Sequence, residues 1–376
     1  MKYYTVETKN KSIFKVFAIY YICMAVFCAI RIQMSSNGSF EGVWGDIYSS
    51  FVIQILIMFL LPLFLYCLCI KVKPRQVFKS CNFETLNFNA ILISIALGIL
   101  CFFINIAVSS LFSGILTFTG YRYPGSSGNV DYSTGHFFLE LFLVAVLPAF
   151  CEEFTHRGIL LQGIKHAGFK KAILISSLMF GLIHFNVQQF FYAFIIGLIL
   201  GFVSVVAKNI FPAMIIHFVN NAISVYLDYA SNRGWIFGDA LNGLQSLLTS
   251  GNAFAIFAIT AGAMILIVLL LCLFVWLLYK QSLVRKVNKA INKVYNSPEI
   301  KDNVPIVVNK EALIVDLLEK NTLLNLDFKK MDNPIDIVLP KEKSRYRMSS
   351  KDKIFMWGAI ILGGLVTLFT YIWGLL

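Results

Sequence analysis

Residues 252–279 read NAFAIFAITAGAMILIVLLLCLFVWLLY, a run without Asp, Glu, Lys, Arg or His. A helix needs about 20 consecutive apolar residues to cross a hydrocarbon core of roughly 30 Å, so this run is long enough for one membrane crossing. The rest of the chain has the same character, because 58% of its 376 residues are hydrophobic and only 14% are charged. This balance excludes an ordinary water-soluble globular protein.

Apolar runs of this kind predict nine transmembrane helices, and hence an all-α, polytopic transmembrane helical bundle. The nine runs cover approximately 13–30, 48–70, 90–113, 137–155, 172–187, 189–207, 210–228, 252–279 and 354–376. The fifth and sixth runs nearly meet at Asn186–Gln189, which predicts a helical hairpin.

The net charge of +12 does not indicate nucleic-acid binding, because the basic residues alternate along the spans instead of gathering on a soluble surface. Lys and Arg are frequent before the first span, at 71–79, at 165–171, at Lys208 and throughout 280–353, whereas the intervening loops carry only three. The positive-inside rule therefore predicts a multi-pass plasma-membrane protein with a cytoplasmic N-terminus.

Five parts are expected along the chain. They are an N-terminal membrane region of three spans at 1–135, a polar-studded membrane core at 136–230, an outer loop and span at 231–279, a basic cytoplasmic segment at 280–353, and a last span at 354–376. Apolar and basic residues alternate at helical spacing in 281–295. This pattern predicts either an amphipathic helix on the inner leaflet or a solvated linker helix.

Ionisable residues are unusual at membrane depth and indicate a functional site by default. The fourth predicted span ends in CEEFTHRG at 151–158. On a helix, Glu153 and Arg157 share a face, as do Glu152 and His156. The simpler interpretation is an interfacial cap in which Glu153 and Arg157 anchor the helix end.

Two further spans carry histidines. His184 lies in the fifth span, and the seventh contains His217 and Asn221 at a spacing that places them on one face. Buried structural histidines and hydrogen bonds between helices would explain each residue separately. Their joint concentration with the carboxylates in three of nine spans favours a common site.

These residue types supply the groups that amide hydrolysis by water requires: a carboxylate base, an imidazole and hydrogen-bond donors for an oxyanion. There is no HExxH motif of the zincin type. No cofactor is required, and zinc held by Glu152, His184 and His217 is the alternative.

In order along the chain, Glu152-Glu153-x-x-x-Arg157, Phe180-x-x-x-His184 and His217-x-x-x-Asn221 match the three motifs of the CAAX-protease and bacteriocin-processing (CPBP, or Abi) family. The resemblance covers about 150–225, and the family includes the type II CAAX prenyl endopeptidases. It implies that Glu152 and His184 activate water, while His217 and Asn221 hold water and stabilise the oxyanion.

The resemblance further implies that Glu153 and Arg157 support the site as an ion pair. His156 departs from it, since this position is usually apolar in the family, and its spacing from Glu152 predicts an influence on that carboxylate. Family members are described both as metalloproteases and as glutamate proteases, so both mechanisms stay open.

The predicted function is an intramembrane endopeptidase that cuts a peptide or membrane protein near the cytoplasmic side, in peptide processing or self-immunity. The expected site is a polar cavity among spans four to seven, with Glu152 and His184 in direct or one-water contact. The expected partners are this substrate and membrane lipid, without nucleic acid. The alternative is a non-catalytic membrane immunity or transport protein that uses the polar cluster for binding.

Overall fold

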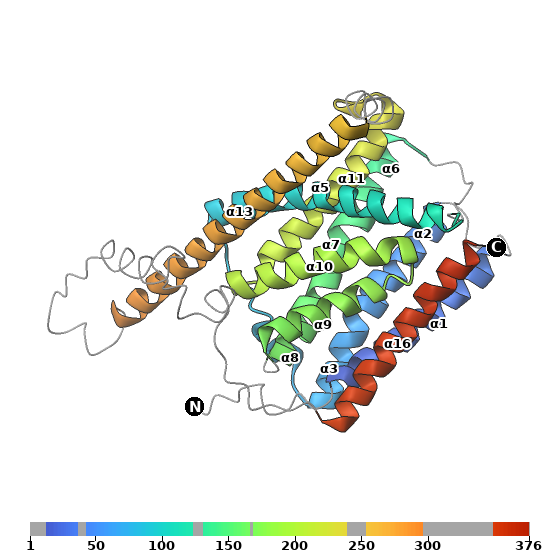
Figure 1. The fold of residues 1–376 in the computed structure, drawn as a ribbon. Helices are drawn as coiled ribbons and strands as arrows, with labels where there is room; N and C mark the ends of the chain where they lie inside the picture. Colours follow the sequence, from blue (N-terminus) through green and yellow to red (C-terminus); the bar gives the residue numbers. More distant parts are fainter. Residues whose placement is uncertain are drawn as a thin grey trace.

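Helices form all the regular secondary structure in the part of the chain that the computed structural model describes, namely 13–36, 43–122, 131–165, 168–238, 253–295 and 349–375. The predicted all-α membrane bundle is therefore confirmed (Figure 1). Most of the basic segment 280–353 lies outside the described residues.

Six helices are long and apolar enough to cross a membrane, and they correspond to the predicted first, second, third, sixth, eighth and ninth spans. They are Ile13–Met34, Val43–Ile70, Phe88–Phe118, Val187–Ala207, Ala261–Arg285 and Ser350–Trp373. The remaining three predicted spans are also helical, but each is shorter or carries more polar side chains. The count of nine therefore stays a prediction.

The N-terminal region consists of three long helices and one short one. They are α1 (Ile13–Ser36), the continuous run α2 (Val43–Ser50), η3 (Phe51–Leu60) and α3 (Leu61–Ile70), the short α4 (Pro74–Ser80), and α5 (Phe88–Phe118). Asn87 begins α5 by accepting a hydrogen bond from the N–H of Ala90 at 2.9 Å.

The predicted membrane core contains four helical runs. The first is continuous over α6 (Thr134–Glu140), η4 (Leu141–Val146), α7 (Leu147–Glu153), η5 (Phe154–Leu161) and α8 (Gln162–Ile164), and it is followed by α9 (Phe169–Leu182), α10 (Val187–Ala207) and α11 (Phe211–Arg233). The helix of the fourth predicted span therefore continues past the predicted end near 155. The charged motif lies inside a helix that continues to Ile164, because the residues that follow it are themselves buried.

The predicted hairpin between the fifth and sixth spans is present, with a turn at residues 183–186. Phe185 adopts a left-handed conformation with φ of 48°, and the side chain of Asn186 accepts from the N–H groups of Gln188 and Gln189 to begin α10. Because α9 ends at Leu182, His184 lies in this turn and not inside an apolar helix as predicted.

Glycines allow α9 and α10 to pack closely. A Cβ atom on Gly197 would lie 3.2 Å from the Phe180 ring and from Cβ of Ser177, and one on Gly201 would lie 3.2 Å from Ile173. Small residues four apart let membrane helices approach each other in this way. The approach brings the backbone of α10 next to the charged motif.

Two π-helical turns interrupt the runs just before a proline. η3 precedes Pro62 and η4 precedes Pro148. Proline has no N–H, so it donates to no carbonyl of the π-helical turn before it. The hydroxyl of Thr155 on η5 donates to one carbonyl of η3, the carbonyl of Met58. The hydrogen bond joins the second span directly to the helix of the charged motif.

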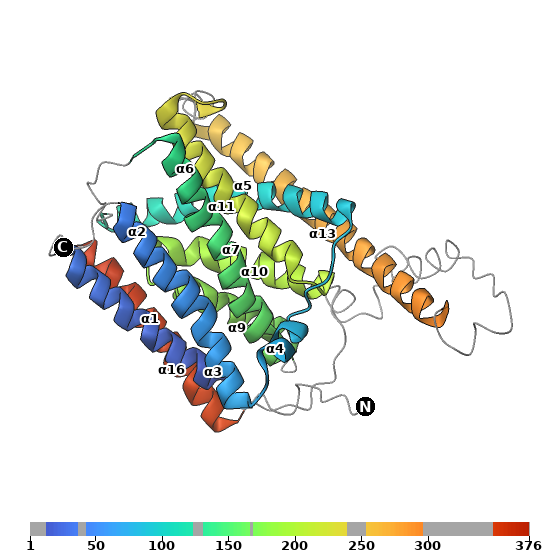
Figure 2. The same cartoon turned by 180° about the vertical axis from the view of Figure 1, so that it is seen from behind.

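The C-terminal helices lie at the periphery. α16 (Ser350–Trp373) runs beside α1 and also packs on α9, while α13 (Ala253–Tyr295) lies along α5 and α10 on the other side (Figures 1 and 2). The helix expected at 281–295 is a direct continuation of α13. It is therefore not a separate helix that turns onto the membrane surface.

Candidate active site

The charged motif lies in the interior of the bundle. Glu152 and Glu153 end α7, and His156 and Arg157 fall in the first turn of η5. All four side chains are buried, and Glu153 and Arg157 are fully inaccessible. The simpler interpretation of an interfacial cap is thereby excluded, since a cap would leave these groups exposed to water.

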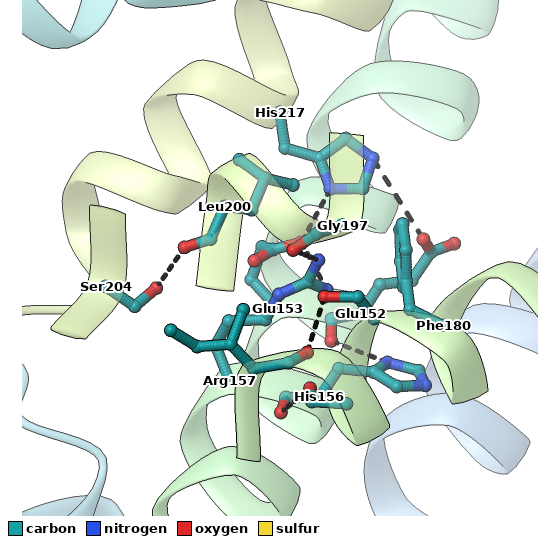
Figure 3. A network of polar contacts seen from close by, with 12 residues as sticks. Glu152, Glu153, His156, Arg157, Phe180, Gly197, Leu200, Ser204 and His217 are labelled. Carbon is teal, nitrogen blue, oxygen red and sulfur yellow. Dashed lines mark hydrogen bonds and ion pairs between the residues drawn. The ribbon is translucent and has the colours of Figure 1, made fainter. Parts of the chain in front are cut away.

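Arg157 is held by three partners from three helices. Its guanidinium lies 3.1 Å from Oε1 of Glu153, and it donates to the carbonyl of Gly197 at 3.2 Å (Figure 3). The same group stacks over the Phe180 ring, 4.2 Å from the centroid. The ion pair expected from the spacing of Glu153 and Arg157 is therefore present, and it ties α7 and η5 to α9 and α10.

His217 on α11 connects the two carboxylates. Its Nδ1 lies 3.0 Å from Oε1 of Glu153, and its Nε2 lies 4.0 Å from Oε2 of Glu152 (Figure 3). A carboxylate can only accept, so Nδ1 carries a proton and donates to Glu153. This bond fixes the ring and turns Nε2 toward Glu152. The distance of 4.0 Å is too long for a hydrogen bond and suits a bridging water.

Glu152 has a second neighbour in the N-terminal region. Nε2 of Gln54 on η3 donates to Oε1 of Glu152 at 2.9 Å, and both side chains are buried. The two oxygens of Glu152 therefore face different partners, Gln54 on one side and His217 on the other.

Of the predicted direct or one-water contact between His184 and Glu152, the direct form is absent from the described contacts and the water-mediated form stays a prediction. Nδ1 of His184 donates to the carbonyl of Phe180 at 2.8 Å, one turn earlier. The Phe180 ring lies between the two histidines of the motifs, with centroid distances of 5.1 Å to His184 and 6.0 Å to His217. The Phe180 ring thus packs against both imidazoles. Among the described contacts, however, it is His217 and not His184 that lies beside Glu152.

Asn221 is engaged in hydrogen bonds along its own helix and to a neighbouring one. Its Nδ2 donates to the carbonyl of Val144 at 2.9 Å, and its Oδ1 accepts from Asn220 at 2.8 Å. Val144 lies in η4, the π-helical segment that precedes Pro148. One N–H of Asn221 therefore donates to a backbone carbonyl just before a proline, as the Thr155 hydroxyl does at Met58.

His156 is turned away from the Glu152 carboxylate. Its Nδ1 donates to the backbone carbonyl of Glu152 at 3.0 Å, and its ring packs edge-on against Phe17, Tyr20 and Phe180. The contact expected between His156 and the carboxylate is therefore replaced by one with the backbone. This is the geometry of a buried structural histidine.

The zinc alternative requires Glu152, His184 and His217 to converge. Within the described ranges, no three His, Cys, Asp or Glu side chains are grouped closely enough to hold a metal ion.

A cavity of about 320 Å³ lies away from this site, between the start of α5 and α13, with Asn87 and Arg285 in its wall. The polar cavity expected at the site itself stays a prediction.

The sequence reasoning missed three of these partners. Gln54 gave a usable signal, because it is the single side-chain amide between residues 51 and 70, a stretch without Asp, Glu, Lys, Arg or His. The carbonyls of Gly197 and Val144 gave no direct signal, since backbone groups are identified only once two helices are placed beside each other.

The arrangement can support acid–base chemistry. The Glu152 carboxylate lies 4.0 Å from one imidazole nitrogen of His217, a separation that one bridging water can span, and the other ring nitrogen is held by a second carboxylate. The same logic of an oriented imidazole operates in catalytic triads, where the carboxylate fixes the tautomer.

A comparison with protein-family models matches residues 134–223 to the family described as type II CAAX prenyl endopeptidase, Rce1-like. Searches of curated proteins and of solved structures returned no match. The matched segment contains all three motifs and the whole arrangement of Glu152, Glu153, Arg157 and His217. Residues 134–223 of this multi-pass membrane protein are therefore similar to the Rce1-like type II CAAX prenyl endopeptidase family, in agreement with the resemblance carried by the three motifs.

Proposed function

We propose that the chain is an intramembrane endopeptidase that cleaves peptide bonds by direct attack of water. The observation that carries the proposal is the 4.0 Å gap between Oε2 of Glu152 and Nε2 of His217, buried inside the segment that matches the Rce1-like family. A carboxylate and an imidazole nitrogen at a separation that one bridging water can span are groups that a water-activating site needs.

In the proposed reaction, Glu152 takes a proton from the water while the water oxygen bonds to the scissile carbonyl carbon. The carbonyl electron pair moves onto oxygen. Nε2 of His217 lies where it can accept a hydrogen bond from the water, and it can donate to the oxyanion once the ring is protonated on both nitrogens. The C–N bond then breaks, and Glu152 returns the proton to the leaving amine. Glu153 acts by holding the His217 ring through Nδ1.

His184 and Asn221 keep supporting roles in the proposal. Nε2 of His184 has no hydrogen bond within the described residues and is free to bind water. The Asn221 amide has two N–H groups, of which one is used on Val144 and the other can donate to an oxyanion. The reaction as written requires no resident metal, so metal-free protein verified by elemental analysis should retain its turnover.

We further propose that the substrate is a peptide or membrane protein that reaches the site from the cytoplasmic side, in peptide processing or self-immunity. His217 lies six residues into α11, about 9 Å from the start of that helix. This start lies next to Lys208 in the sequence. Lys165, Lys170 and Lys171 lie where the helical run that contains Glu152 ends and α9 begins. Positive charge marks the cytoplasmic side.

Replacing Glu152 with Gln tests the activity. Glu152→Gln keeps the shape but removes the base, so the rate of cleavage of an internally quenched, farnesylated CAAX peptide in proteoliposomes should fall at least about 100-fold. Glu140→Gln, the same change in the same helical run, is the control and should leave the rate unchanged. Equal cleavage by wild type and Glu152→Gln would refute the proposal and favour a binding role in immunity or transport.

The orientation has its own test. A cysteine introduced near Lys310 should resist membrane-impermeant thiol reagents in intact cells, whereas one near Gly125 should react. The reverse labelling pattern would place the site toward the outer leaflet.

A further inference from the structure

Gln54 is a polar residue in an otherwise apolar stretch, outside the segment that matches the Rce1-like family. It lies in η3 between Ile53 and Ile55, and its side chain is about nine-tenths buried. A primary amide in such a place costs free energy unless it is hydrogen-bonded. A leucine would pack there without this cost, so the amide requires an explanation.

The one hydrogen bond that Gln54 makes within the described residues runs to Glu152. Nε2 donates to Oε1 of the carboxylate at 2.9 Å, while the Oε1 atom of Gln54 is buried without a partner. An ionised carboxylate only accepts, so the amide must present its NH₂ end to Glu152. The orientation of Gln54 is thus set by Glu152 alone.

This contact lies beside the reacting side of Glu152. With Oε1 held by Gln54, the other oxygen, Oε2, faces Nε2 of His217 across the 4.0 Å gap. Rotation of the carboxylate about its terminal bond would close or skew this gap. A donor on Oε1 resists that rotation, since a hydrogen bond to a charged acceptor is strong and directional.

The backbone around Gln54 is fixed to the same helix. The Thr155 hydroxyl on η5 donates to the carbonyl of Met58, one turn beyond Gln54. Two hydrogen bonds therefore join η3 to the helix of Glu152. The one from Thr155 satisfies the backbone, and the one from Gln54 reaches a side chain of the site.

We propose that Gln54 is a positioning residue for Glu152: it holds one carboxylate oxygen so that the other is presented to the attacking water. The inference rests on the proposed function. It extends the site to the second span, which contributes a side chain that the three sequence motifs do not contain.

The kinetic test uses Gln54→Met, which keeps the length and the apolar packing but removes the donor. Turnover of the farnesylated peptide should fall about tenfold to a hundredfold with KM unchanged, because misplacement of a base by about 1 Å costs rates of this order. Gln54→Glu, isosteric but without the donor when ionised, should be at least as impaired.

Thr155→Val is the matched control, because it removes the other hydrogen bond at the same helix contact. It should lower the melting temperature while leaving turnover per folded molecule close to wild type. If Gln54→Met and Thr155→Val behaved alike, losing stability without a specific loss of turnover, Gln54 would be a structural residue and the inference would be wrong.

A second measurement does not depend on activity. In the infrared spectrum of reconstituted protein, the Glu152 carboxylate band is identified by its loss in Glu152→Gln. Gln54→Met should shift this band and Thr155→Val should not. An unshifted band in Gln54→Met overturns the inference even if no substrate is cleaved, whereas unchanged turnover in Glu152→Gln overturns the proposed function alone.

Discussion

Arg157 offers the sharpest test of how the site is built. Its guanidinium is fully buried and meets the Glu153 carboxylate at 3.1 Å, the Gly197 carbonyl at 3.2 Å and the Phe180 ring at 4.2 Å. Arg157→Met retains much of the side-chain volume and removes the charge. The variant therefore leaves Glu153 charged, buried and without its cationic partner.

The expected cost is large. Removing one partner of a buried ion pair destabilises proteins by about 3–5 kcal/mol, because an uncompensated charge stays in a medium of low dielectric constant. Total stabilities are typically about 5–15 kcal/mol, so Arg157→Met consumes a large part of the margin. We expect a lower abundance in membranes and a lower melting temperature in detergent, in addition to lost activity.

A second substitution separates charge from packing. Glu153→Gln combined with Arg157→Met removes both charges while Gln can still accept from His217, so part of the lost stability should return. Arg233→Met, at the exposed end of α11, is the control and should melt like wild type. A stable Arg157→Met protein with a purely catalytic defect would refute the structural role of the ion pair.

Two further predictions follow from the packing of α11. Asn221→Ala should destabilise the protein by about 1–3 kcal/mol and lower its melting temperature, because it removes a donor from a backbone carbonyl. An unchanged melting temperature would refute this structural role, and a loss of turnover without a loss of stability would assign Asn221 to catalysis alone. Gly98→Ala places a Cβ atom 2.6 Å from Val219 and should cost about 1–3 kcal/mol, whereas Gly114→Ala in the same helix meets nothing within 4 Å and should be neutral or slightly stabilising. Equal melting temperatures for the two glycine variants would contradict the close contact between α5 and α11.

The sequence by itself determined the helical class and the local pairs. Long apolar runs specify membrane helices, because backbone groups in lipid must be satisfied within the segment. The pairing of Glu153 with Arg157 was equally predictable, since residues four apart on one helix are neighbours whatever surrounds them. The hairpin at Asn186 also followed from local residues.

Local patterns could not predict the end of the fourth helix. A charged stretch such as 151–158 is typical of the edge of a span, but in the structure the helix that contains it continues to Ile164. Its charges are neutralised by partners on other helices, so the helix need not stop where the charges begin.

Only the tertiary structure decided which groups meet around Glu152. His217 lies beside it, although His184 was expected there, and Gln54 reaches it from the second span. One N–H of the Asn221 amide donates to the Val144 carbonyl. The physical reason is that the rotation and depth of each helix are set by packing against its neighbours. This packing depends on close approaches such as that at Gly197 and on side-chain hydrogen bonds to backbone carbonyls near prolines, and the apolar pattern of a membrane span records neither.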